Sequence, residues 1–119
     1  MINKDLEIFK KQVQEQRDII GVRDWSIAVD MDELEEDRVA QCSADVQNRC
    51  VLITINKTIE NPTKEQLEDA ARHEILEISV ADIRELLCSF FNWDFVDGIL
   101  HKHIRRIENA LRHKVKQGK

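Results

Sequence analysis

Apolar residues recur at near-helical spacing among charged residues over positions 3–20, which predicts an amphipathic helix there. Gly21 comes directly after this segment and is a typical helix stop. The apolar positions that carry the helical period are Leu6, Phe9, Val13 and Ile20.

The middle of the chain carries the period-two pattern of β-strands. In WSIAVDM, residues 25–31, large apolar side chains alternate with small or polar ones, which indicates a half-buried strand. Residues 39–56 predict a hairpin with Gln47-Asn48 as a two-residue turn, because that register places each inward residue opposite another inward residue. The expected pairs are Val51 with Ala44, Ile53 with Cys42, and Ile55 with Ala40.

Two helices are predicted in the C-terminal half. The first spans residues 61–88, and Thr63 with Gln66 forms a capping box at its start. The sequence SFFNW, residues 89–93, interrupts the helical pattern, and Asp94 is expected to cap a terminal helix. The apolar stripe of that helix has spacings of four, three and four, at Leu100, Ile104, Ile107 and Leu111.

The order helix, three strands, helix, helix predicts one α+β domain over residues 1–119, built on a small three-stranded antiparallel sheet. A chain of 119 residues with 42% hydrophobic and 34% charged residues has the size and composition of an ordinary soluble domain. No apolar run approaches the roughly 20 residues that cross a bilayer, and the N-terminus lacks the apolar stretch of a signal peptide. We therefore expect a cytoplasmic protein with no membrane partner.

Charge and cysteine content remove further classes of protein. The formal net charge of −5 argues against general affinity for nucleic acids. Cys42, Cys50 and Cys88 are odd in number and lack C-x-x-C spacing, so we expect three buried free thiols rather than a disulfide framework or a cysteine zinc ribbon.

The segment ARHEILE, residues 71–77, has the spacing of a metal site. His73 and Glu77 are four residues apart, so on a helix both project from one face toward the same ion. A carboxylate oxygen binds zinc at about 2.0–2.2 Å and is an admissible ligand, while Glu74 occupies the position of a general base. A salt-bridged, solvated helix would contain the same residues without any metal.

A third ligand is expected on the terminal helix, in LHKHIRRIENAL. His101 and Glu108 share its inward apolar stripe, and a polar pair on such a face needs a partner. A metal shared with the preceding helix would supply one, with His101 as the third ligand and Glu108 as the alternative. His101 could equally be a core-edge histidine bonded to a carboxylate, and His103 and His113 are expected to be exposed.

The order of helix, W-x-I-x-V strand, hairpin, A-R-H-E-I-L-E helix and H-x-x-I-R-R-I-E-N-A-L helix resembles the small zincin-like metallopeptidases of phages and prophages. The resemblance covers about residues 6–111, and the architecture of that family is similar to those of minimal gluzincins and SprT-like proteases. It implies a zincin-like hydrolase that binds zinc or a similar divalent transition metal and cleaves a peptide or protein substrate with metal-activated water.

The family's site residues fall on particular positions of this chain. Its first ligand corresponds to His73, its catalytic base to Glu74 and its second ligand to Glu77, which stands where the family usually has histidine. The ligand of the terminal helix corresponds to His101, or alternatively to Glu108.

Two alternatives to a peptidase follow from the same sequence. One is a catalytically inactive zincin-fold binding module of phage or prophage origin, because a missing second histidine is what drift after loss of catalysis produces. The other is a small assembly protein that uses an exposed aromatic patch to bind a partner. We expect instead that the aromatics of SFFNWDFV fill the gap between the last two helices; they are Phe90, Phe91, Trp93 and Phe95.

Overall fold

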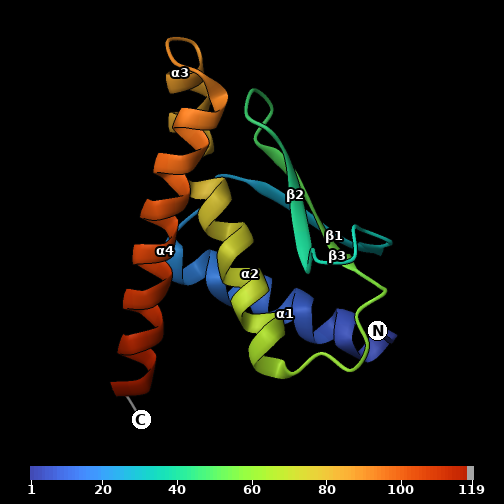
Figure 1. The fold of residues 1–119 in the computed structure, drawn as a ribbon. Coiled ribbons are helices and arrows are strands. Elements are labelled where there is room, and N and C mark those ends of the chain that lie inside the picture. The colour runs from blue at the N-terminus through green and yellow to red at the C-terminus, as the bar shows by residue number, and fades with distance from the viewer. Residues whose placement is uncertain (118–119) are drawn as a thin grey trace. The chain divides into compact units, whose positions relative to one another are not determined.

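The structure is a computed structural model that describes residues 1–117, with side chains through residue 113. The chain forms two compact units, Met1–Ser79 and Val80–Lys119, which we call the first and the second unit. The first unit contains two helices and a three-stranded sheet, and the second contains two helices (Figure 1). The fold class is therefore α+β, as predicted.

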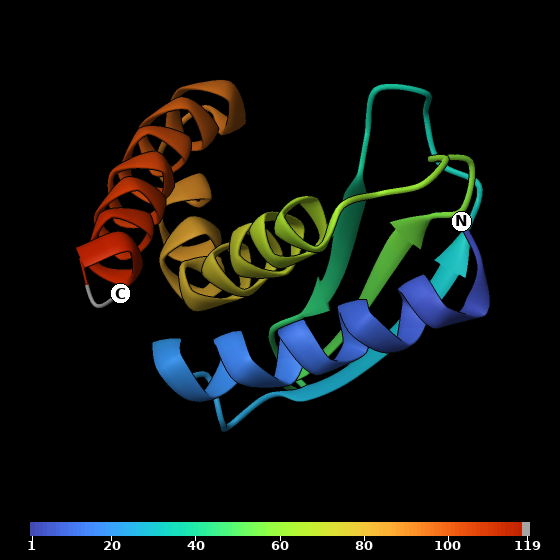
Figure 2. The same ribbon diagram turned by 90° about the horizontal axis from the view of Figure 1, so that it is seen from below.

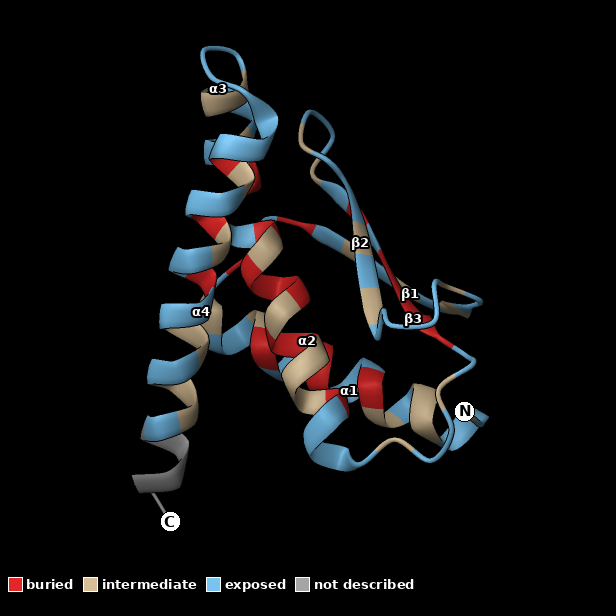
Figure 3. Cartoon of the chain, viewed as in Figure 1, coloured by how far each residue is buried: buried red, intermediate tan, exposed pale blue. Residues whose placement is uncertain are grey.

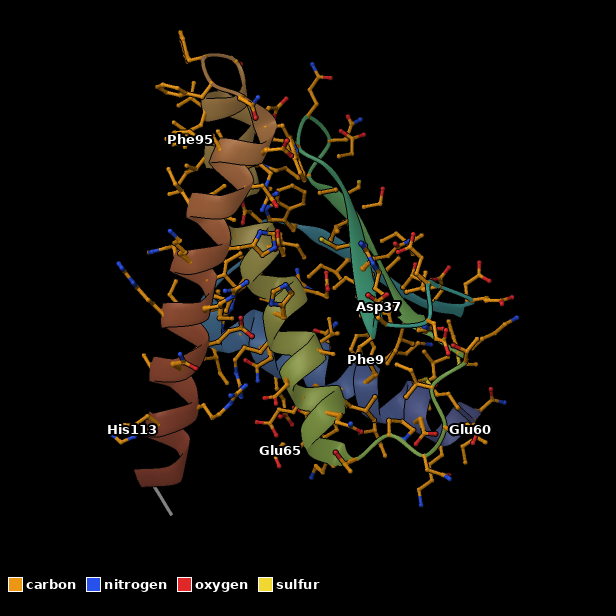
Figure 4. All side chains as sticks on the ribbon, viewed as in Figure 1. Phe9, Asp37, Glu60, Glu65, Phe95 and His113 are labelled. Carbon is orange, nitrogen blue, oxygen red and sulfur yellow. The ribbon has the colours of Figure 1, made fainter. Side chains whose placement is uncertain are left out.

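Helix α1, Asn3–Ile20, has the predicted bounds. The Asp5 carboxylate accepts a hydrogen bond from the backbone N–H of Ile2 at 3.0 Å, which satisfies a free donor at the helix start. Gly21 ends the helix with φ of 91°, a left-handed conformation that glycine adopts without steric cost. Phe9 is fully buried and points from α1 toward the sheet (Figure 4).

The sheet consists of β1 (Ser26–Asp32), β2 (Ala40–Asp45) and β3 (Cys50–Asn56), in the order β1-β3-β2. Strands β2 and β3 are antiparallel in the predicted register. The expectation of an all-antiparallel sheet is wrong, because β1 pairs with β3 in parallel. The segment after β1 crosses to the other side of β3, where β2 begins the hairpin. The alternation of side chains along a strand does not indicate the direction of that strand, so the parallel pairing of β1 could not be predicted from it.

The hairpin turn explains how β2 and β3 join without a glycine. The expected two-residue turn at Gln47-Asn48 is wrong, because the last ladder pair is Asp45 with Cys50 and residues 46–49 form a four-residue loop. Asp45 accepts hydrogen bonds from the backbone and side-chain nitrogens of Asn48 at 3.2 and 2.8 Å, an arrangement that stabilises turns locally. Arg49 takes the left-handed conformation that glycine usually supplies.

Helix α2, Lys64–Ser79, completes the first unit. Its predicted capping box is confirmed, since Thr63 and Gln66 exchange reciprocal hydrogen bonds of 2.8 and 3.0 Å. Helix α2 packs beside α1 and contacts β2, while α1 contacts β1, so both helices cover one face of the sheet (Figure 2). Three buried apolar residues alternate along β3 and share one face, Val51, Ile53 and Ile55, and Figure 3 colours parts of β3 as buried.

The second unit consists of α3, Ala81–Cys88, and α4, Trp93–Gln117. The expectation of one helix over 61–88 is wrong, because the backbone leaves helical geometry at Val80, with φ of −103° and ψ of 3°. The Ser79 hydroxyl also donates to the Leu76 carbonyl at 2.6 Å, a side-chain bond that competes with helical hydrogen bonding. The break therefore coincides with the boundary between the two units.

The start of α4 differs from the expected cap. The side-chain oxygen of Asn92, rather than Asp94, accepts hydrogen bonds from the first free backbone N–H groups, those of Asp94 and Phe95. Asparagine is as good a cap as aspartate, so the expectation of Asp94 as the cap is wrong by two residues. The predicted apolar stripe is confirmed, with Leu100 and Ile104 buried and Ile107 and Leu111 half-buried.

Two burial expectations are wrong. All three cysteines are free, as predicted, but Cys50 is exposed and Cys42 and Cys88 are only half-buried. The aromatics of SFFNWDFV do not fill a gap between helices. They are exposed, because the inward positions at the start of α4 are taken by Val96 and Leu100. Within the described residues, no helix has the length and apolar character needed to span a membrane.

Candidate metal centre

The pair His73 and Glu77 lies on one continuous helix, α2, as the spacing predicts. His73 Nε2 and Glu77 Oε1 are 3.6 Å apart, and both side chains are partly exposed. Two ligand atoms that each lie about 2 Å from one tetrahedral ion are separated by roughly 3.3 Å. The pair therefore has nearly the separation required of two ligands to the same ion without any change of backbone.

Glu74 lies beside this pair but in different surroundings. It is buried, with 6% of its surface exposed. Burial raises the pKa of the Glu74 carboxyl, an effect only partly offset by the charge of His73 and by a hydrogen bond from the Cys42 thiol of β2. A carboxyl with a raised pKa exchanges protons nearer to neutral pH, which suits a general acid or base.

The charges earlier on α2 have a different role. Arg72 is buried, and its guanidinium binds Glu68 at 2.9 Å and Asp69 at 3.1 Å, one turn toward the helix start. Helix α2 is therefore not a uniformly solvated charged helix. Its first turns hold a partly buried ion-pair network, which leaves His73 and Glu77 as a separate pair further along.

His101 lies on α4, and Asp97 fixes the orientation of its imidazole ring. The sequence alone did not predict this role of Asp97. His101 Nδ1 lies 2.9 Å from the backbone carbonyl of Asp97 and 3.2 Å from the Asp97 carboxylate. A carbonyl only accepts hydrogen bonds, so Nδ1 carries the proton and Nε2 keeps its lone pair. Metal-binding histidines typically have such a partner on the second nitrogen.

Arg84 of α3 extends this arrangement. Its guanidinium binds the same Asp97 carboxylate, on the oxygen that does not face His101. The chain Arg84–Asp97–His101 therefore orients the imidazole from both helices of the second unit. The signal in the sequence was an aspartate one helical turn before the histidine, a spacing that places two side chains on the same helix face.

In the first unit, His73 and Glu77 offer one imidazole and one carboxylate, and in the second unit His101 offers an imidazole whose Nδ1 is already bonded. Two imidazoles and one carboxylate make up a ligand set that catalytic zinc sites use. Glu108, the alternative third ligand, is half-buried on α4. His103 and His113 are exposed, as predicted, and His113 is labelled on α4 in Figure 4.

Compared with protein-family models, with curated proteins and with solved structures, the chain matches none.

Proposed function

We propose that the chain is a metal-dependent hydrolase of peptide bonds, in which His73, Glu77 and His101 bind zinc or a similar divalent transition metal. The observation that carries the proposal is the His73–Glu77 pair at 3.6 Å, next to a buried carboxyl at Glu74. Because α2 and α4 belong to different units, the joining of His101 to the pair is part of what we propose.

The chain's own residues fit the requirements of such a site. His101 presents Nε2 because Asp97 occupies Nδ1. His73 binds through the nitrogen that already faces Glu77. Three protein ligands leave a fourth position open, which distinguishes catalytic zinc sites from closed structural ones. A bound zinc ion would supply Lewis-acid activation of water and of the substrate carbonyl.

Glu74 would serve as the general base. In this role its carboxylate takes a proton from the attacking water and then delivers it to the departing amine. Burial has raised the pKa of this carboxyl, which makes it a better proton acceptor than an ordinary glutamate. The Cys42 thiol, which donates to the carboxyl, would fix its orientation.

The edge strand β2 supports a peptide substrate. It pairs with β3 on one side only, so the backbone groups of its other side are available to an extended chain that adds as a further strand. Cys42 belongs to β2 and contacts Glu74. A peptide bound along this edge would therefore pass close to the general base.

Hydrolysis of a casein or quenched-peptide mixture by zinc-loaded protein tests the proposal. Glu74→Gln should abolish turnover and leave zinc affinity nearly unchanged, because this residue acts on the water rather than on the ion. The matched control is Glu60→Gln, an exposed carboxyl in the loop before α2 (Figure 4), which should retain full activity. Equal turnover in wild type and Glu74→Gln would contradict the proposed mechanism.

A non-catalytic metal-binding module is the second candidate. The burial of Glu74 favours it, because a base with 6% exposure needs a local opening to reach a water molecule. Glu77 as ligand also adds negative charge, which weakens the ion as a Lewis acid. Stoichiometric zinc binding without hydrolysis of any peptide in the mixture would favour this second function.

A further inference from the structure

Seven large apolar side chains of the second unit are exposed. Their exposed fractions run from 49% to 76%, with Phe90 the most exposed. They come from α3, the connecting turn and the start of α4, where Figure 3 shows exposed surface and Figure 4 labels Phe95. We call this set the aromatic face: Ile83, Leu86, Phe90, Phe91, Trp93, Phe95 and Ile99.

Two members of the aromatic face, Ile83 and Leu86, lie on α3, a helix that is apolar on two sides. Helix α3 buries Ala81 and half-buries Leu87, yet it also exposes Ile83 and Leu86. A helix that is apolar around most of its circumference is normally buried. We therefore expect the exposed apolar side of α3 to contact another protein surface.

The area of the aromatic face suits a second protein chain. If each of the seven side chains can bury about 200 Å², their exposed fractions together amount to roughly 800 Å² of apolar surface. The largest apolar patch on a typical monomer is about 300–600 Å². A stable, specific interface buries about 800 Å² on each partner. The aromatic face and its immediate rim thus supply nearly the whole area that a dimer needs.

The charges around the aromatic face decide against a membrane. Residues 81–99 contain no lysine, and the single arginine, Arg84, binds Asp97. The other acidic side chains of this segment are the carboxylates of Asp82, Glu85 and Asp94. Surfaces that bind anionic lipids carry lysine and arginine instead.

We propose that the aromatic face is a homodimer interface, through which two copies of the chain pack their α3–α4 hairpins together. The same face on both copies makes a closed, isologous contact, and two helical hairpins form a four-helix arrangement. Phe91 and Phe95 already pack against each other, with ring centroids 6.0 Å apart, so part of the surface is ordered before association.

Sedimentation velocity of the metal-free full chain tests the dimer. Wild type should sediment with twice the chain mass of 14.0 kDa at micromolar concentration. Leu86→Gln and Phe90→Gln should each weaken the dimer at least about tenfold, because every substitution removes two interface side chains. Ile19→Gln is the matched control, since Ile19 is 61% exposed on α1 and outside the aromatic face. A wild type that stays monomeric would overturn the proposal.

The salt dependence of association and the fluorescence of Trp93 distinguish a homodimer from other molecules that could cover the aromatic face. The carboxylates at the rim repel each other across a two-fold interface, so added salt should strengthen a homodimer. Binding to a basic partner or to vesicles should instead weaken with salt. Dilution of the wild type should shift Trp93 emission to longer wavelength, and Phe90→Gln should show the shifted emission at all concentrations. Dissociation by salt, or loss of the dimer in Ile19→Gln, would contradict the proposal.

Discussion

The two units of the chain differ in how they bury apolar surface. In the first unit, Phe9, Ile53 and Ile75 are completely buried, and the helices and sheet share one core. In the second unit, Val96 and Ile104 are buried, but a whole apolar face stays exposed. The first unit therefore has a hydrophobic core of its own, whereas the second depends more on polar bonds and on what its outer face meets.

The candidate metal ligands are also positioned by different forces in the two units. His73 and Glu77 are positioned by α2, a helix whose neighbouring residues Ile75 and Leu76 are part of the core. His101 is positioned by hydrogen bonds to Asp97 instead. Packing and hydrogen bonding thus orient different ligands of the same proposed centre, and each can be perturbed separately.

The largest expected effect is on the free energy of unfolding, when an isoleucine is replaced by alanine in each unit. Ile53→Ala removes a fully buried side chain and should lower the free energy of unfolding by about 2–5 kcal/mol. Ile83→Ala, at a side chain that is half exposed, should cost less than about 1 kcal/mol in dilute, monomeric protein. Urea unfolding followed by circular dichroism measures both. Equal losses would contradict the contrast between the units.

A smaller effect, on zinc affinity, is expected in the second unit, where a hydrogen bond from His101 to Asp97 rather than packing positions the ligand. Asp97→Asn should weaken zinc binding about 10- to 100-fold, because the imidazole of His101 loses its charged partner. The control is Asp94→Asn, an exposed carboxylate one turn earlier on α4, which should change zinc affinity little. The ¹⁵N chemical shifts of His101 should report mixed tautomers in Asp97→Asn. A single unchanged tautomer would show that Asp97 does not position the ring.

The smallest effect is a pH dependence that arises in the first unit. The pKa of Glu74 in the folded protein is raised above its ordinary value of 4.5, so the folded state binds more protons between the two values. The free energy of unfolding should therefore fall as pH rises from 4.5 through the folded pKa. Glu74→Gln should remove that slope in metal-free protein, and Glu60→Gln should keep it. Parallel curves for all three proteins would contradict the burial effect.

Local signals in the sequence predicted most elements of the fold. The α1 bounds, the Thr63–Gln66 cap and the register of β2 with β3 are set by nearby residues, and all three predictions are confirmed. The direction of β1 relative to β3 depends on how residues 33–39 cross the sheet, which periodicity does not encode. The helix break at Val80 was missed because its flanking residues are ordinary helix formers.

The candidate centre was predictable only in part. The spacing of His73 and Glu77 places them on one helix face, and the structure confirms this pair. The role of Asp97 could not be predicted, because an aspartate four residues before a histidine is also typical of an ordinary helix surface. The exposure of Phe90 could not be inferred, because composition favours aromatics in the core when few others are available.

Zinc titration of the full chain against a chromophoric chelator, with three histidine variants, tests the central claim most directly. We expect one zinc ion per chain, with binding weakened at least about a hundredfold in both His73→Ala and His101→Ala, because each loses one of three ligands. His103→Ala, an exposed histidine on α4, should bind like the wild type. Absence of zinc binding in the wild type, or equal affinities for His101→Ala and His103→Ala, would contradict the proposed centre.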